Sequence, residues 1–227
     1  MTRARRVLGS LAIGLIFFLE SKCSSGRPLG ASSGAVADVV AGYERQRSRA
    51  WDPARRFKAL FKAEVSPTVG AVGRGYLSVW WDGASGVLTW RTSAPIGGAG
   101  RGGILRVKES GGETAVREDG PQLSKRLAAP DLAACILGTP DAPGEAQLPF
   151  EETPRGLRLR IDGSKRTALL NGEGKPIELA FPGGEVVTLQ PGEGVPRRIE
   201  ARGRDGRAIL TLESYGPWPP SEKIPPL

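Results

Sequence analysis

Few residues in this sequence of 227 could carry out catalysis. There is no histidine, which excludes histidine-based triads, two-histidine metal sites and the commonest general base. Two acidic pairs, Glu118-Asp119 and Glu151-Glu152, are adjacent in sequence, and neighbours on a strand point to opposite faces. Neither pair therefore predicts an acid/base couple, and solvated charge is the simpler interpretation. The sequence predicts no enzyme, no cofactor and no metal site.

Two further features have known chemical uses that their surroundings do not support. Cys135 lies on the apolar side of a predicted helix without an activating partner, which is typical of a buried structural thiol. The stretch GGAGRGG, residues 97–103, contains a G-x-G-x-x-G pattern that starts at Gly98. That pattern holds a pyrophosphate only where a helix begins directly after it, whereas here the strand-like run ILRV follows. We therefore expect a loop and no nucleotide site.

The N-terminus has the features of a secretion signal. Arg3, Arg5 and Arg6 precede an apolar run over residues 7–19. This run is shorter than the roughly 20 residues that span a bilayer, but it has the length of a signal-peptide core. We interpret residues 1–22 as a signal peptide and expect export.

Cys23 follows this signal directly and has three possible uses. It can lie beside an ordinary cleavage site, it can pair with Cys135, or it can become the lipidated first residue of a mature lipoprotein. Residues 23–34 are rich in Ser and Gly and predict a flexible tether, which favours lipidation. Glu20 and Lys22 depart from the aliphatic and small residues that bacterial lipoproteins usually have at these places.

The chain is basic, with a formal net charge of +8, but its basic residues are scattered. In LRLRID, Arg158 and Arg160 alternate with Leu157, Leu159 and Ile161, as in a strand with one wet face and one buried face. A basic stripe with stacking aromatics is missing, so we expect no nucleic-acid binding. The charge favours attraction to an anionic membrane surface or an acidic partner.

Hydrophobic periodicity predicts two helices among many strands. The spacing of three valines and Tyr43 predicts an amphipathic helix over residues 35–48. A second apolar pattern covers residues 121–138, where Gly138 and Pro140 form a helix-stop signature. Alternating patterns bounded by turn residues predict strands over residues 57–65, 76–81, 87–91, 104–107, 114–117, 157–161, 167–170, 177–181, 185–189, 198–201 and 208–212.

Such evenly spaced strands predict a mainly β fold of the α+β kind. We expect one antiparallel sheet that curls into a barrel or a half-barrel, with the two helices covering its open face. The Pro-rich tail, residues 219–227, is expected to be irregular.

Three segments occur in a characteristic order. They are VWWDGASGVLTWRTSAPIGG with Pro95-Ile96-Gly97 near its end, DLAACILGTP, and VPRRIEARGRDGRAILTLESYGPW. They correspond to an aromatic hairpin, a Pro-aliphatic-Gly loop, a helix that ends in Leu-Gly-x-Pro and a closing hairpin. In this order they resemble the outer-membrane lipoprotein receptor of the lipoprotein localisation system. Periplasmic lipoprotein carriers are similar in architecture. The resemblance covers about residues 35 to 218.

The resemblance implies a strongly curved antiparallel half-barrel over residues 35–218, whose concave apolar face accepts acyl chains. It also implies that Pro95, Ile96 and Gly97 form a protruding loop that inserts into the membrane. The residues that could line the apolar face, or instead form a closed core, are Phe57, Phe61, Trp80, Leu88, Trp90, Leu105, Val107, Leu159, Leu179, Phe181 and Leu189.

We therefore expect an envelope lipoprotein that binds the acyl chains of lipoproteins and helps to deliver them to the outer membrane. Its expected partners are those acyl chains, a periplasmic lipoprotein carrier and the outer membrane, which it would reach as a monomer through a lipid on Cys23. Ser24 stands where inner-membrane lipoproteins of some bacteria carry aspartate, so the resemblance favours the periplasmic face of the outer membrane. The alternative is a structural or interaction lipoprotein of the same fold with a closed interior and no transfer activity.

Overall fold

The computed structural model describes residues 33–68, 70–93, 102–106, 129–141, 147, 149–161, 166–204, 206–219 and 221–223. Its helices are α1 (Ser33–Ala50) and α3 (Ala129–Leu137). The strands are β1 (Arg56–Pro67), β2 (Gly73–Asp82), β3 (Val87–Thr92), β4 (Gly102–Arg106), β5 (Glu151–Thr153), β6 (Gly156–Arg160), β7 (Thr167–Leu170), β8 (Pro176–Ala180), β9 (Val186–Gln190), β10 (Arg198–Gly203) and β11 (Gly206–Pro217).

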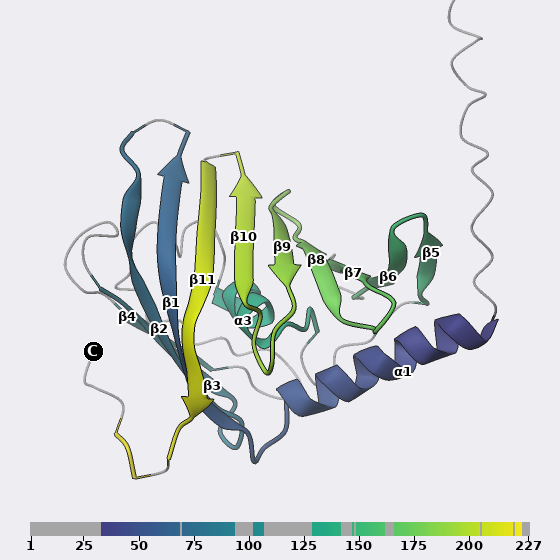
Figure 1. Cartoon of the computed structure of the whole chain (residues 1–227), viewed down its shortest axis with the longest axis horizontal. Coiled ribbons are helices and arrows are strands. Elements are labelled where there is room, and N and C mark those ends of the chain that lie inside the picture. Colours follow the sequence, from purple (N-terminus) through teal and green to yellow (C-terminus); the bar gives the residue numbers. More distant parts are fainter. Residues whose placement is uncertain are drawn as a thin grey trace, which may run out of the picture. The chain divides into compact units, whose positions relative to one another are not determined.

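All eleven strands form one sheet in the order β4-β3-β2-β1-β11-β10-β9-β8-β7-β6-β5. Every pairing is antiparallel, and only β1–β11 joins strands that are distant in sequence. The short strands β4 and β5 stand at opposite ends of this order, so the sheet is open (Figure 1). This confirms the predicted open antiparallel sheet. That both helices cover the open side of the sheet remains a prediction.

The first helix forms where the valine spacing predicts it. Val36, Val39 and Val40 pack against the core while Tyr43 is completely buried, which gives α1 one apolar side. Arg47 and Arg49 lie in the last turn, where cations stabilise the C-terminal end of a helix. In the view of Figure 1, α1 passes beneath strands β6 to β9.

The second helix is short, and its residues from Leu132 to Leu137 are all apolar and buried. It begins at Ala129, with Pro130 in its first turn, where a missing N–H costs no hydrogen bond. It ends at Leu137, and the next residue, Gly138, has a left-handed φ of 69° and donates its N–H to the carbonyl of Ala134 at 2.9 Å. Pro140 follows, as the sequence predicts.

The predicted strands that fall on described residues agree with the observed ones, and their boundaries differ by at most five residues. The three-residue strand β5 was not expected from the sequence. The predicted signal peptide, the predicted strand over residues 114–117 and the first part of the predicted second helix lie outside the described residues.

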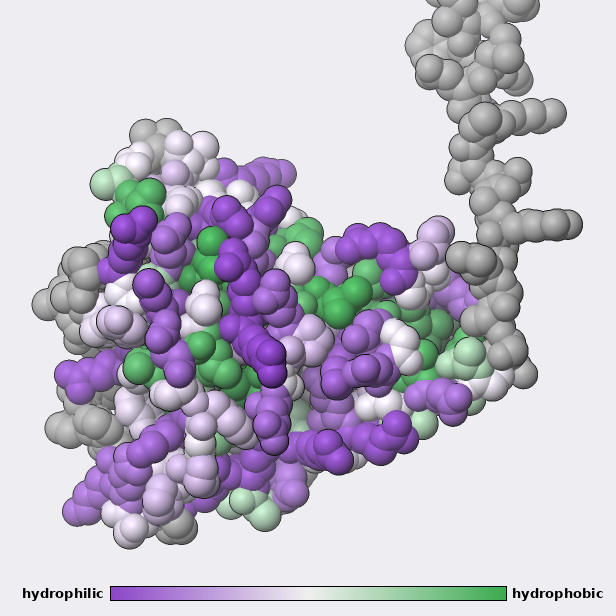
Figure 2. Space-filling view, in the orientation of Figure 1, coloured by the Kyte–Doolittle hydropathy of each residue, from purple (hydrophilic) through white to green (hydrophobic). Residues whose placement is uncertain are grey.

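The face of the sheet opposite α3 carries most of the charge. Lys58 and Lys62 of β1 and Arg202 and Arg207 of β10 and β11 are exposed there, and hydrophilic side chains cover much of the surface in Figure 2. Neither α1 nor α3 is long and apolar enough to cross a bilayer.

Candidate functional site

The strand register assembles one apolar face from residues far apart in sequence. Opposed residues of antiparallel strands share a face, so Phe61, Leu77 and Leu212 lie in one row across β1, β2 and β11. A second row crosses β8 and β9 through Leu179 and Val187. We call this the interior face, and its buried residues form a single cluster with those of α3.

Most residues predicted for the apolar face lie in this buried cluster. Those that the structure places there are Phe57, Phe61, Leu88, Trp90, Leu159, Leu179, Phe181 and Leu189. Leu105 stands opposite Leu88 in the β3–β4 register. Val107 lies outside the described residues. Whether these residues contact an acyl chain stays a prediction.

Trp80 was wrongly predicted to lie on this face. It pairs with Lys58 on the outer side, whereas its neighbour Trp81 pairs with Phe57 and is completely buried. The two tryptophans are adjacent, and a shift of one residue along a strand reverses the face. The sequence held a usable signal, because Trp81 continues the alternation of Leu77 and Val79.

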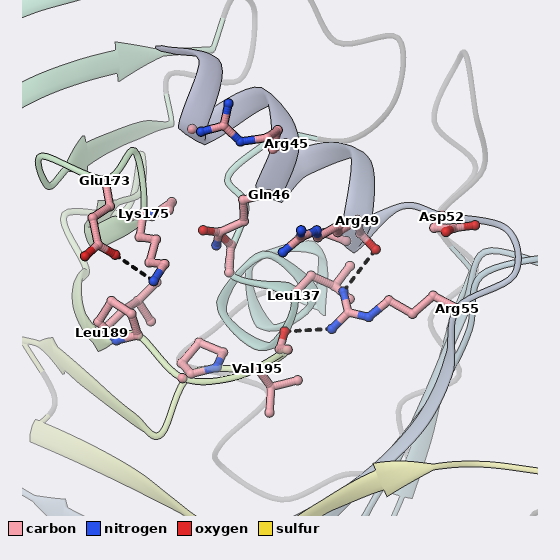
Figure 3. Close-up of a pocket in the computed structure, with 18 of the residues that line it drawn as sticks. Arg45, Gln46, Arg49, Asp52, Arg55, Leu137, Glu173, Lys175, Leu189 and Val195 are labelled. Carbon is pink, nitrogen blue, oxygen red and sulfur yellow. Dashed lines mark hydrogen bonds and ion pairs between the residues drawn. The ribbon is translucent and has the colours of Figure 1, made fainter. Parts of the chain in front are cut away.

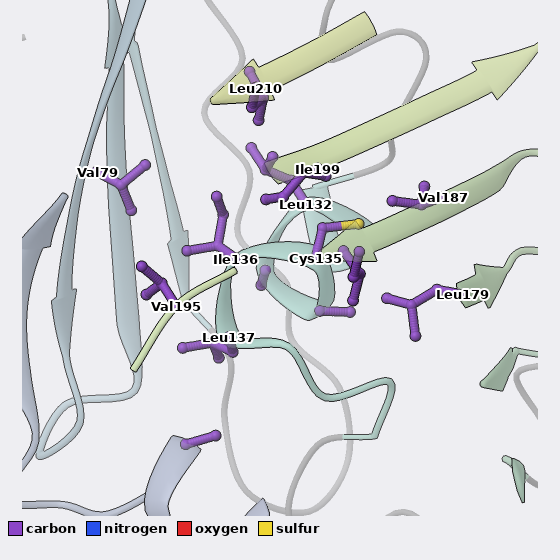
Figure 4. Packing of buried hydrophobic residues seen from close by; sticks show 14 of the residues in the cluster. Val79, Leu132, Cys135, Ile136, Leu137, Leu179, Val187, Val195, Ile199 and Leu210 are labelled. Atoms are coloured by element: carbon purple, nitrogen blue, oxygen red, sulfur yellow. The ribbon is translucent and has the colours of Figure 1, made fainter. Parts of the chain in front are cut away.

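Helix α3 occupies the middle of the interior face. Figure 4 shows Leu132 and Ile136 of α3 among Val79, Ile199 and Leu210 of the surrounding strands. Every residue from Leu132 to Leu137 is at most 6% exposed. This part of the interior is thus filled by the chain itself.

A cavity of about 640 Å³ opens beside this packed region. Its walls come from the last turns of α1, the end of α3, the β7–β8 turn and the β9–β10 connection (Figure 3). Leu137, Leu189 and Val195 are buried residues that line it, and Tyr215 stands at its edge, 39% exposed. The sequence analysis named only Leu189 of these, since the cavity depends on how α1 docks against the sheet.

Two glycines bring α1 into direct contact with the β7–β8 turn. A Cβ at Gly42 would lie 2.2 Å from the carbonyl oxygen of Glu173, and one at Gly174 would lie 2.3 Å from that of Val39. Gly174 also has a φ of 78°, which side-chain-bearing residues rarely adopt. These contacts fix one wall of the cavity.

A buried polar network holds the C-terminal half of α1. Asp141, completely buried after α3, forms an ion pair with Arg47, whose Nε lies 2.6 Å from its carboxylate, and it accepts hydrogen bonds from Gln147 Nε2 at 2.6 Å and from the Tyr43 hydroxyl. Burial raises the pKa of Tyr43, and the Asp141 carboxylate raises it further, so the hydroxyl stays protonated as a donor. Trp51 Nε1 donates to the carbonyl of Asp141 at 3.0 Å.

The cavity has the size of a small-molecule pocket. Among the residues described, no three His, Cys, Asp or Glu side chains are grouped to hold a metal ion. The cavity volume lies within the range of about 300–1,000 Å³ typical of small-molecule pockets. Cys23 and the Pro95-Ile96-Gly97 segment lie outside the described residues.

Comparison with known proteins gives matches among solved structures alone. No protein-family model matches the chain, and no curated protein does. A LolA superfamily protein, NE2245 from Nitrosomonas europaea, is 12% identical with a TM-score of 0.47, over 81% of this chain and 94% of that one. A domain from Vibrio parahaemolyticus described as an outer membrane lipoprotein-sorting protein is 10% identical with a TM-score of 0.44, over 83% and 95%.

A third similar structure is a DUF1329 family protein from Desulfovibrio piger, 10% identical with a TM-score of 0.38, over 79% of this chain and 93% of that one.

Proposed function

We propose that this chain is an envelope lipoprotein that binds the acyl chains of other lipoproteins and helps to deliver them to the outer membrane. The observation that carries the proposal is the cavity beside α3, whose apolar residues adjoin the interior face. Leu137 and Leu189 belong to both the cavity wall and the buried cluster. An acyl chain that enters the cavity therefore meets apolar surface continuous with the core.

The energetic gain from such binding is large. Each CH₂ group withdrawn from water contributes roughly 0.8 kcal/mol, so a long acyl chain contributes about 10 kcal/mol. A lipoprotein that crosses an aqueous compartment needs a host of this kind. Tyr215, which is 39% exposed, offers apolar surface with which the first part of a chain would make contact.

The competing function is that of a structural or interaction lipoprotein with a closed interior. One observation favours it: α3 already fills the middle of the interior face with Leu132, Ile136 and Leu137. The two functions differ in whether the cavity accepts an apolar ligand, and a binding measurement separates them.

Blocking the cavity tests the proposal. Ala54 lines the cavity and is exposed, so Ala54→Phe adds bulk at the site with little effect on the core. Ala84→Phe is the matched control, because Ala84 is an exposed turn residue outside the cavity lining. The full chain should bind a triacylated lipopeptide saturably, with affinity reduced at least tenfold by Ala54→Phe and unchanged by Ala84→Phe. Equal affinities in all three proteins would support the structural alternative.

Delivery is proposed to depend on the Pro95-Ile96-Gly97 segment, as the resemblance implies. An apolar side chain that enters the bilayer gains about 1.5–3 kcal/mol, enough to bias where a released acyl chain goes. Ile96→Glu should leave lipopeptide binding intact and reduce transfer to vesicles. Val72→Glu is the control, since Val72 is 53% exposed on another loop. Unchanged transfer in Ile96→Glu, or equal loss in both variants, would refute this role.

A further inference from the structure

The cavity has a cationic rim as well as an apolar wall. Arg45 and Arg49, one helical turn apart on α1, line it together with Arg55 and Lys175 (Figure 3). The lining contains four cationic and two acidic side chains, an excess of two positive charges. This excess is local, whereas the basic residues of the sequence are scattered along the chain.

The two acidic side chains do not neutralise the arginines of α1. Glu173 is paired with Lys175, whose Nζ lies 2.7 Å from its carboxylate. Asp52 turns towards its own backbone and accepts from the N–H of Ala54 at 2.8 Å. Within the part of the chain that the structure describes, no carboxylate lies within ion-pair distance of Arg45 or Arg49.

Arg55 adds a positive charge to the rim, and backbone oxygens fix the position of its guanidinium group. Its guanidinium donates to the carbonyl of Gly194 at 2.7 Å and to that of Arg49 at 3.5 Å. These acceptors hold the guanidinium between the end of α1 and the β9–β10 connection without cancelling its charge. The rim therefore carries two uncompensated guanidinium groups on α1 and a third that bridges to the opposite wall.

We propose that this cavity binds an anionic amphiphile, a molecule with an apolar chain and a phosphate or carboxylate head. The chain would lie along Leu137, Leu189 and Val195, and the head would accept hydrogen bonds from Arg45 and Arg49. Guanidinium groups present paired N–H donors that match the oxygens of such anions. Neither half of the site suffices alone, because the apolar wall selects no head group and the exposed arginines hold no chain.

This inference goes beyond the proposed function and can fail separately from it. A triacylated lipoprotein anchor has an acylated amine and no charge, so acyl binding alone gives Arg45 and Arg49 no role. An anionic amphiphile is thus a different ligand class, of which anionic phospholipids and fatty acids are members.

The test measures binding to the full chain by native mass spectrometry from a non-ionic detergent. The probes are dioctanoyl phosphatidylglycerol, octanoic acid, neutral dioctanoylglycerol and inorganic phosphate. We expect the phosphatidylglycerol to bind one-to-one, at least tenfold more tightly than dioctanoylglycerol or inorganic phosphate binds. A factor of this size corresponds to the contribution of a charge-assisted hydrogen bond. Competition between octanoic acid and the phosphatidylglycerol for the same site would support recognition of the anionic head, whether this head is a carboxylate or a phosphate.

Two double variants with the same change in net charge complete the test. Arg45→Gln with Arg49→Gln should abolish the preference for the anionic lipid, whereas Arg91→Gln with Arg204→Gln, at exposed sites outside the cavity lining, should keep it. Equal affinity for the anionic and neutral lipids, equal loss in both double variants, or inorganic phosphate binding as tightly as the lipid would overturn the proposal. Binding of the triacylated lipopeptide in the same samples reports separately on the proposed function.

Discussion

At the scale of single residues, Asp141 has the largest predicted effect on how α1 is held. Its side chain is completely inaccessible to solvent, and it contacts Arg47, Gln147 and the Tyr43 hydroxyl. A buried carboxylate is tolerated only where charge and hydrogen bonds compensate its desolvation. These contacts join α1 to the chain that follows α3.

Asp141→Asn should therefore destabilise the protein more than the loss of a surface ion pair does. Breaking a buried pair costs about 3–5 kcal/mol, and because Arg47 is 26% exposed we expect a loss near 2 kcal/mol in the free energy of unfolding. Glu64→Gln is the control, because Glu64 pairs with Arg74 at 3.3 Å on the surface and should cost less than 1 kcal/mol. Denaturant unfolding of both variants measures this difference. Similar losses would contradict the structural role of Asp141.

Glu200 gives the fold a dependence on acidic pH. Hydrogen bonds from Arg207, supported by Arg202, lower the pKa of Glu200 from its ordinary value of 4.5 to about 2. A carboxylate with a lowered pKa stabilises the native state above the ordinary value, and this contribution disappears as the pH falls towards 2. Glu200→Gln should cost roughly 1 kcal/mol at pH 7 and progressively less as the pH falls through about 2, and Glu213→Gln, at an exposed site on β11, serves as the matched surface control. Thermal midpoints across this pH range measure both, and a pH-independent difference for Glu200→Gln would contradict the assignment.

At the scale of elements, the contact between α1 and the β7–β8 turn depends on Gly42. Alanine is the better helix former by about 1 kcal/mol, so Gly42→Ala would stabilise an isolated helix. Here the added Cβ meets the Glu173 carbonyl at 2.2 Å, and we expect a net loss of about 1 kcal/mol or more. Ser48→Ala, at an exposed position of the same helix, should give a small gain. Thermal midpoints that rise for both variants would show that α1 does not press on the turn.

The elements themselves could be predicted from the sequence better than the site could. Strand alternation and the valine spacing of α1 are local patterns, and they identified both helices and most strands. The strand β5 was missed because Glu151, Glu152 and Thr153 have no apolar alternation. The cavity rim combines residues 45–55 with 173–196, and no local pattern indicates that these segments meet.

At the scale of the whole molecule, the account requires an anchor at Cys23. Protein extracted from membranes should have a mature N-terminus at Cys23 and a mass increased by acyl groups, because the Ser- and Gly-rich residues 23–34 suit a tether. Cys23→Ser should remove this mass increase and release the exported protein from the membrane, while Cys135→Ser, at a buried position, should keep it. A mature protein that starts elsewhere, or a Cys23–Cys135 disulfide, would contradict the anchor.

The central claim is that an acyl chain enters the cavity beside the interior face. The most direct measurement is quenching of tryptophan fluorescence by a triacylated lipopeptide with brominated acyl chains, added to the full-length variants Tyr215→Trp and Tyr76→Trp. Both tyrosines are exposed, but Tyr215 lines the cavity and Tyr76 lies on the outer face of β2. The account predicts saturable additional quenching for Tyr215→Trp and none for Tyr76→Trp. Equal quenching of the two variants, or no saturable quenching of either, would contradict it.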